Sequence, residues 1–155
     1  MTTSMVKNIP AKRVDVVSVK LVRESSVMYE PRYINTPQDA VHLVEDFLAY
    51  SDREKVVAIC LDVKNQPTAI STISMGTLNS SLVHPREVFS EAVINSASSI
   101  ILVHNHPSGE TEPSREDIAL TNRLDECGKI LGIRILDHII IGDGEFYSFK
   151  EEGLL

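Results

Sequence analysis

Cysteine is scarce in this chain of 155 residues, which contains only two, Cys60 and Cys127, and no C-x-x-C pair. Both lie in apolar periodic segments, so the sequence predicts two buried free thiols in a reducing compartment. Long apolar runs are missing as well, and none approaches the ~18 residues that a membrane span requires. The first residues carry no apolar core typical of a secretion signal, which predicts a cytoplasmic protein without membrane contact.

An excess of basic charge is also lacking. The chain carries 15 lysines and arginines against 22 aspartates and glutamates, a formal net charge of −7. Domains that bind duplex nucleic acid usually show a basic excess or a basic stripe, and here the basic residues are scattered, apart from a modest cluster in residues 7–13. Nucleic acid is therefore disfavoured as the main partner, although net charge does not reveal local patches.

Hydrophobic residues make up 43% of the chain, which is enough for one domain with a core. Apolar periodicity predicts a mixed β-sheet with helices packed on it, an α/β (α+β) fold. Strands are predicted at 14–22, 54–62, 68–76, 98–106, 133–141 and 146–149. Helices are predicted to begin at Thr36-Pro37, at Pro85 and near Ser114, and the last ends at Gly132. Residues 77–85 are expected to form a loop, and an exposed edge near 68–76 could pair two chains, although the oligomeric state stays open.

The segment HNHPSGETEPSRED, from His104 to Asp117, carries the residues best suited to chemistry. His104 and His106 end a predicted strand, so their side chains leave by one face and Asn105 by the other. The chain then reverses and could return the carboxylate of Asp117 to both imidazoles, giving three ligands and the open position of a catalytic zinc site. Ser114 and Asp117 also fit an S-x-x-D helix cap, and the pattern leaves both interpretations open.

The spacing H-x-H-x7-S-x2-D of this segment resembles the JAMM signature of JAB/MPN metallopeptidase domains, with all four positions filled. The stretches VHPREVF, HNHPSG and DHIIIG, in that order, are similar to the bacterial RadC branch of this family. The resemblance implies a RadC-like JAB/MPN domain over residues 31–155, related in fold to cytidine deaminases, after an N-terminal extension or strand at 1–30. Relatives often carry an N-terminal helix-hairpin-helix region, and we expect this chain to be a stand-alone catalytic domain without one.

A zinc site that activates water also needs a general base. JAMM-like sites take this acid from the beginning of a strand after the first helix, so the resemblance implies Glu54, with Glu87 and Glu91 on the second predicted helix as alternatives. The resemblance also implies that the hydroxyl of Ser114 hydrogen-bonds the oxyanion, although it could cap the helix instead or as well. His138, next to an aspartate in an apolar strand, is interpreted as a satisfied core residue or a support for the ligands.

The resemblance therefore implies a zinc-dependent hydrolase of the JAMM type, in which Zn²⁺ is held by His104, His106 and Asp117 and activates water to cut a peptide or isopeptide bond. The partner is then a peptide or protein substrate, whose identity the sequence does not give. One alternative is a DNA-repair or DNA-metabolism protein, a label that RadC-like proteins carry; another is a non-catalytic scaffold, which the filled ligand positions disfavour. The H-E-x-x-H and P-C-x-x-C motifs of other zinc enzymes are absent.

Overall fold

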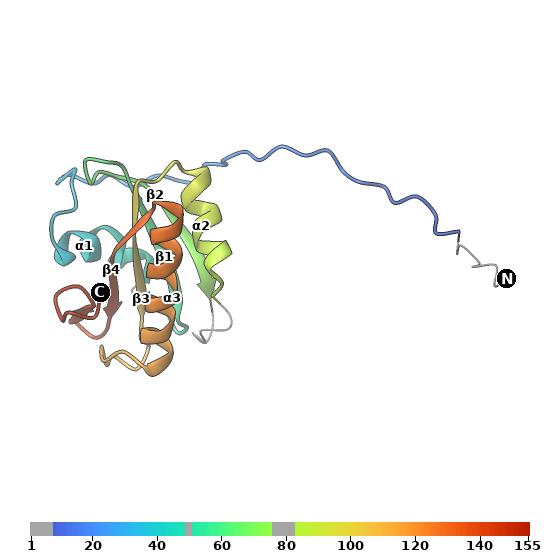
Figure 1. Cartoon of the computed structure of the whole chain (residues 1–155). Coiled ribbons are helices and arrows are strands. Elements are labelled where there is room, and N and C mark those ends of the chain that lie inside the picture. Colours follow the sequence, from blue (N-terminus) through green and yellow to red (C-terminus); the bar gives the residue numbers. More distant parts are fainter. Residues whose placement is uncertain (1–7, 49–50, 76–82) are drawn as a thin grey trace.

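The protein folds as one β-sheet between two layers of helices, as a computed structural model describes it for residues 8–48, 51–75 and 83–155 (Figure 1). Five strands form a single mixed sheet in the order β2-β1-β3-β4-β5. Helix α1 packs on one face, and α2 and α3 pack on the other. The predicted mixed sheet flanked by helices is therefore confirmed. Within the described ranges, no helix has both the length and the apolar character needed to cross a membrane.

The elements follow one another along the chain as α1 Pro37–Leu48, β1 Lys55–Leu61, β2 Pro67–Met75, α2 Pro85–Ile94, β3 Ser99–Asn105, α3 Arg115–Leu131, β4 Arg134–Ile141 and β5 Phe146–Ser148. β1 pairs antiparallel with both β2 and β3, so β2 lies at an edge of the sheet as expected. β3 and β4 are parallel, and a parallel pair needs a crossover, which α3 provides. The start of α3 therefore lies near the carboxyl end of β3.

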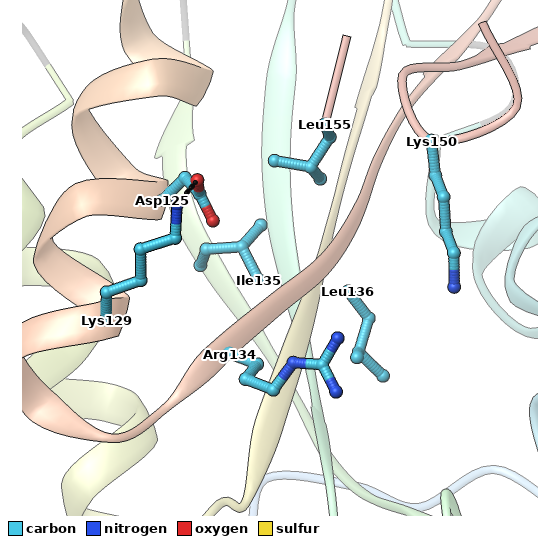
Figure 2. A pocket seen from close by; sticks show the side chains of 7 residues that line it. All are labelled: Asp125, Lys129, Arg134, Ile135, Leu136, Lys150 and Leu155. Carbon is cyan, nitrogen blue, oxygen red and sulfur yellow. Dashed lines mark ion pairs between the residues drawn. The ribbon is translucent and has the colours of Figure 1, made fainter. Parts of the chain in front are cut away.

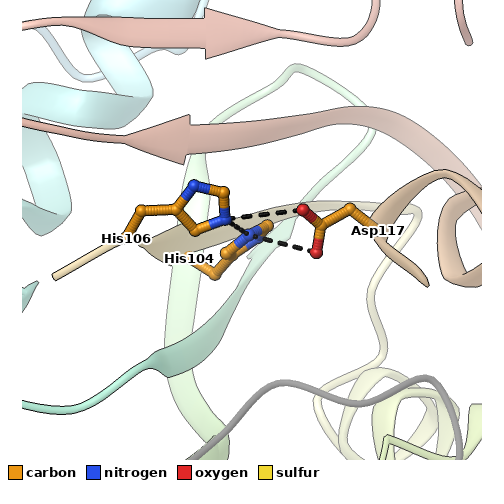
Figure 3. Close-up of side chains that lie close together, drawn as sticks. All are labelled: His104, His106 and Asp117. Atoms are coloured by element: carbon orange, nitrogen blue, oxygen red, sulfur yellow. Dashed lines mark hydrogen bonds and ion pairs between the residues drawn. The ribbon is translucent and has the colours of Figure 1, made fainter. Parts of the chain in front are cut away.

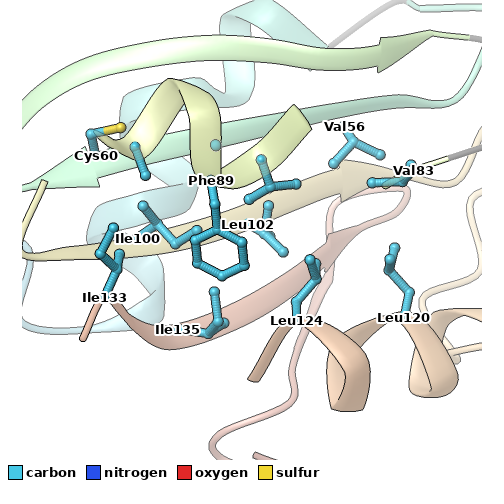
Figure 4. Close-up of a cluster of buried hydrophobic side chains, with 13 residues drawn as sticks. Val56, Cys60, Val83, Phe89, Ile100, Leu102, Leu120, Leu124, Ile133 and Ile135 are labelled. Carbon is cyan, nitrogen blue, oxygen red and sulfur yellow. The ribbon is translucent and has the colours of Figure 1, made fainter. Parts of the chain in front are cut away.

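Two clusters of buried apolar side chains hold the layers together. The alternation of side chains along a strand sends the even-numbered residues of β1 and β3 towards α2 and α3 and the odd-numbered ones towards α1. The cluster on the α2 and α3 side (Figure 4) includes Val56, Ala58, Cys60, Phe89, Ile100, Leu102, Leu120 and Leu124. Cys60 is buried and Cys127 is partly buried, and both are free thiols. By the same alternation, the side chain of His104 lies on the α2 and α3 side of the sheet.

The helices begin where the sequence predicts them. At α1, the Asp39 N–H donates to Thr36 Oγ1 at 3.3 Å and the Thr36 N–H donates to Asp39 Oδ2 at 3.0 Å. α2 begins with Pro85, whose missing N–H has no intrahelical partner to lose. α3 follows the cap residue Ser114 and ends at Gly132. Side-chain caps thus mark the starts of α1 and α3, and a proline marks the start of α2.

The predicted strand at 14–22 is wrong. These residues belong to an extended segment, 8–28, in which every residue is exposed and which pairs with no strand of the described chain (Figure 1). Val14 and Val16 are 77% and 102% exposed. Alternating valines raise β-propensity, but a strand also needs a neighbour that accepts its backbone hydrogen bonds. The predicted loop at 77–85 falls mostly on residues 76–82, which lie outside the described residues.

Removal of the N-terminal residues up to 28 is expected to change the free energy of unfolding by no more than about 0.5 kcal/mol, because the side chains of residues 8–28 are exposed and exposed side chains contribute little. Denaturant unfolding of the full and shortened chains measures this difference. Leu43→Ala is the control for sensitivity, since Leu43 is only 6% exposed and its truncation is expected to cost about 2–5 kcal/mol. A loss above about 1 kcal/mol on shortening would show that the segment packs on the domain.

Candidate metal centre

The carboxyl end of β3 presents two histidines on one face of the sheet. β3 ends at Asn105, and the flanking residues His104 and His106 turn to the same side, so that their Nε2 atoms lie 3.0 Å apart. His104 is completely buried, whereas the side chain of His106 keeps 13% of its surface exposed. The His106 N–H donates to the carbonyl of Ile141 at 2.9 Å, so β4 still holds the chain after β3 has ended.

Asp117, in the first turn of α3, completes a group of three potential ligands (Figure 3). Its Oδ1 lies 3.5 Å from Nε2 of His104, and its Oδ2 lies 3.4 Å from Nε2 of His106. Ligands placed tetrahedrally at 2.0–2.2 Å from a zinc ion lie roughly 3.3–3.6 Å from one another. The two carboxylate distances end on different oxygens of Asp117, and with one ligand atom taken from each residue the three atoms lie within 4.8 Å of one another, which is close enough for one ion to be shared after small adjustments.

The same aspartate is part of a helix cap. The Ser114 N–H donates to Asp117 Oδ2 at 2.8 Å, and the Asp117 N–H donates to Ser114 Oγ at 3.1 Å. The helix cap that the sequence allowed is therefore present, and its reciprocal hydrogen bonds fix the carboxylate that faces the histidines. Ser114 is exposed, and a hydroxyl that accepts one N–H keeps its own proton for another acceptor.

Burial and neighbouring charge set the protonation of the three residues. Burial lowers the pKa of His104 well below its ordinary value. Burial raises the pKa of Asp117, but hydrogen bonding to His106, the charge of His104 and bonds from Ser114 outweigh this and bring it to about 2. The hydrogen bond with Asp117 raises the pKa of His106. Neutral imidazole and carboxylate are the forms that bind metal, so a proton competes with a metal mainly at His106.

Glu54 lies directly before β1, next to the histidines. Val56 stands opposite His104 in the antiparallel pair of β1 and β3, and the same register continued by two residues places Glu54 opposite His106. Opposed residues share a face of the sheet. The charge of Glu54 adds to the raised pKa of His106, after the larger effects of Asp117. Glu54 is not part of the group of potential ligands, and its position is that of a neighbour to the ligands.

Asn105 holds the backbone on both sides of Glu54. Its Oδ1 accepts from the Lys55 N–H at 2.7 Å, and its Nδ2 donates to the carbonyl of Arg53 at 3.0 Å. The sequence predicted that the Asn105 side chain lies on the face of β3 opposite the histidines, but it did not predict these two hydrogen bonds to the backbone beside Glu54. An amide supplies one donor and one acceptor together, which is what two consecutive peptide groups of a neighbouring strand require.

The two alternative glutamates lie on α2. The carboxylate of Glu91 accepts from the hydroxyl of Ser71 at 3.3 Å, and Ser71 stands opposite Ala58 in the middle of β1. Glu87 is exposed in the first turn of α2. The charge of Glu54 raises the pKa of His106, and this effect, together with its position opposite His106, favours Glu54 over both alternatives.

A second layer of polar groups supports His104 from behind. Nε2 of His138 lies 2.7 Å from Nδ1 of His104, and Nδ1 of His138 lies 2.6 Å from the hydroxyl of Thr121. The expectation that His138 is a satisfied residue supporting a ligand agrees with this arrangement. The adjacent Asp137 has a different task, because it accepts from Ser148 at 2.6 Å and from the Lys150 N–H at 3.1 Å. Thr121 was not predicted, since a threonine inside a helix gives no sequence signal.

The loop after His106 is held by a close approach to the turn between β4 and β5. Nδ1 of His106 lies 2.8 Å from the carbonyl of Glu110, and the Asp143 N–H donates to the carbonyl of Gly109 at 3.0 Å. A Cβ at Gly142 would lie 2.3 Å from that Gly109 oxygen, so only glycine fits there. The orientation of the His106 ring therefore depends on a backbone contact with Gly142.

A hollow of about 250 Å³ lies elsewhere in the molecule and contains none of these groups (Figure 2). Arg134, in its lining, stands opposite Ser99 at the start of the parallel strands β3 and β4, whereas the histidines follow the end of β3. Lys129 and Asp125, also in its lining, form an ion pair of 2.9 Å. The hollow is thus at the opposite end of β3 from the metal-binding group, so it plays no part in that centre.

Fold and site together define a domain with a mixed sheet between helices and a group of two histidines and one aspartate at the end of a central strand. The family model of the RadC-like JAB domain matches residues 34–154. The chain therefore belongs to the RadC-like JAB domain family.

Curated relatives in this family are longer proteins. A UPF0758 protein of Desulfitobacterium hafniense is 55% identical over 122 residues, which cover 79% of this chain and 54% of the relative. A UPF0758 protein of Caldanaerobacter subterraneus is 55% identical over 120 residues, 77% of this chain and 52% of the relative. A UPF0758 protein of Desulforamulus reducens is 53% identical over 98% of this chain and 69% of the relative. The chain thus spans about half the length of the first two relatives, and these names state no activity.

Gly142→Ala is expected to weaken zinc binding about tenfold or more, because the added methyl group displaces the loop that orients His106. Gly144→Ala is the matched control: its φ of 70° makes alanine strained by roughly 1–2 kcal/mol, but no atom lies within 4 Å of the new Cβ. Competition with a chromophoric chelator measures zinc affinity, and thermal unfolding measures stability. Equal zinc affinities for the two variants would contradict the role given to Gly142.

Proposed function

We propose that this chain is a zinc-dependent hydrolase of the JAMM type, which cuts a peptide or isopeptide bond in a peptide or protein substrate. The observation that carries this proposal is the convergence of His104, His106 and Asp117, each offering one ligand atom within 4.8 Å of the others. Among the described residues this group has three members, and three protein ligands with an open position are typical of catalytic zinc, whereas structural zinc usually has four.

The chemistry of the three side chains supports zinc as the ion. Imidazole nitrogen and carboxylate oxygen are both common zinc ligands, and calcium or magnesium sites use oxygen almost alone. The lowered pKa values of His104 and Asp117 supply a neutral ring and a carboxylate at neutral pH. Zinc held by His104, His106 and Asp117 would supply a Lewis acid, which lowers the pKa of water towards ~7.

The residues of the chain then have separate tasks in hydrolysis. Glu54 accepts a proton from the attacking water as the oxygen–carbon bond forms, and it returns this proton to the nitrogen as the carbon–nitrogen bond breaks. The hydroxyl of Ser114 donates a hydrogen bond to the carbonyl oxygen as that oxygen gains charge. Its exposed position at the edge of the site, beside buried Asp117, supports this task.

Glu54→Gln is expected to keep bound metal and to lower the rate of hydrolysis about 10²–10⁴-fold, because the amide binds in the same place but takes up no proton. Glu91→Gln is the matched control and is expected to keep the wild-type rate, since Glu91 binds Ser71. Metal content by mass spectrometry and turnover of peptides selected from a library screen provide the two measurements. A Glu54→Gln variant that hydrolyses at the wild-type rate removes Glu54 from the mechanism.

His106→Ala tests the metal centre itself. The variant is expected to lose bound zinc and hydrolysis together, because it removes one of three ligands. Wild-type protein that contains no divalent metal after purification without added metal, and takes up none on addition, would overturn the metal centre. Wild-type protein that binds zinc but hydrolyses nothing in the library would instead overturn the peptidase activity and favour a scaffold.

A further inference from the structure

A chain of hydrogen bonds runs from helix α3 through β4 to the buried ring of His104. The Thr121 hydroxyl donates to the carbonyl of Asp117 at 2.8 Å and also lies 2.6 Å from Nδ1 of His138. Nε2 of His138 lies 2.7 Å from Nδ1 of His104. All these residues are buried: Thr121, His138 and His104 are 0% exposed, and Asp117 is 2% exposed. These residues have little or no contact with bulk solvent, so their partners within this series of hydrogen bonds decide where the protons lie.

When the rings of His138 and His104 are neutral, the protons along this series of hydrogen bonds have one possible arrangement. A hydroxyl has one proton, and that of Thr121 is used on the Asp117 carbonyl, so Thr121 must accept from Nδ1 of His138. A neutral His138 with a proton on Nδ1 carries none on Nε2, so it must accept from Nδ1 of His104. A neutral His104 with its proton on Nδ1 has a bare lone pair on Nε2, the atom that faces His106 and Asp117.

In His106 a single contact has the same effect and leaves the lone pair of the neutral ring on Nε2. Nδ1 of His106 lies 2.8 Å from the carbonyl of Glu110, which only accepts, so Nδ1 carries a proton and the lone pair of the neutral ring is on Nε2. A backbone carbonyl thus orients the ring of His106, and the hydrogen bonds through His138 orient the ring of His104. In both rings the Nε2 lone pair faces the same place. Two bare nitrogens 3.0 Å apart beside a carboxylate suit a shared cation.

We propose that His138, itself oriented by Thr121, is a positioning residue that fixes the tautomer of His104 and so directs the Nε2 lone pair to the metal. This inference rests on the metal centre of the proposed function. Stacking keeps His138 in place, because its ring lies 4.7 Å from that of Phe149 at an interplanar angle of 13°. Thr121 lies one helical turn after Asp117. One face of α3 therefore carries both the potential ligand Asp117 and the first residue of the hydrogen bonds that lead through His138 to His104.

The test compares two replacements of His138, one that keeps a hydrogen-bond acceptor and one that has none. His138→Gln offers an amide oxygen to Nδ1 of His104, whereas His138→Phe fills the space against Phe149 and offers no acceptor. His138→Phe is expected to weaken zinc binding 10–100-fold, the usual effect of removing a group behind a ligand, and His138→Gln is expected to stay within a few-fold of wild type. Thr121→Val, which keeps the shape but removes the hydroxyl, is expected to lie between them.

Ser148→Ala is the control for stability, since it removes a buried hydrogen bond to Asp137 on the same strand as His138 but outside the hydrogen bonds that lead to His104. It is expected to lower the unfolding temperature without changing zinc affinity. Zinc affinity is measured on the full chain by chelator competition. Long-range ¹⁵N–¹H spectra of the metal-free wild type provide a second readout, and the proton of His104 is expected on Nδ1.

The outcomes separate this inference from the metal centre on which it rests. Wild type that binds no zinc overturns the metal centre. Wild type that binds zinc, together with a His138→Phe variant of equal affinity, overturns the role of His138 alone. Should His138→Phe fail to fold, the spectra of wild type and of Thr121→Val decide: a neutral His104 ring protonated on Nε2 in wild type overturns the inference.

Discussion

A histidine ring buried inside a protein needs a partner for each of its two nitrogens, and the architecture of this site follows from that need. His104 is completely buried at the end of a central strand. Its Nδ1 finds a partner because β4 lies parallel beside β3 and sets His138 against it. Its Nε2 faces Asp117 and His106, because the crossover helix α3 starts at the same end of the sheet and carries Asp117. The strand order and the site are therefore two aspects of one arrangement.

Regular structure, or a direct bond to it, fixes each group of the site. His106 follows β3 by one residue and is held by the carbonyl of Ile141 on β4. Glu54 precedes β1, and Asn105 of β3 binds the peptide groups on both sides of it. Groups held in this way need little reorganisation when a ligand or a substrate arrives, which is the arrangement that catalysis by positioned groups requires.

Much of the fold could be predicted from local patterns, and the failures have a common cause. The cap at Thr36, the proline at the start of α2 and the glycine after α3 act within a few residues, so the sequence displays them directly. The closeness of His104, His106 and Asp117 in space could be predicted because a strand, a chain reversal and a helix start are also local features. Residues 14–22 failed as a strand because pairing depends on a partner elsewhere in the chain. Thr121 was missed for the same reason, since its neighbour His138 is remote in sequence.

Two free energies bear on Asp117: the small gain from its part in the helix cap and the larger cost of burying its charge. A helix cap needs only an acceptor, and a negative charge near the first turn adds typically 0.3–1 kcal/mol. Removing a carboxylate from water costs several kcal/mol unless other groups compensate it. Asp117 is 2% exposed, yet its pKa is about 2, so its surroundings hold it charged. The Ser114 N–H donates to this carboxylate and two imidazoles face it, and burial lowers the pKa of one of those rings, His104. The hydrogen bonds from Ser114 supply only part of the compensation, and hydrogen bonding to His106 supplies the largest share, so the buried carboxylate stays charged beside two imidazoles, in the form that binds a cation.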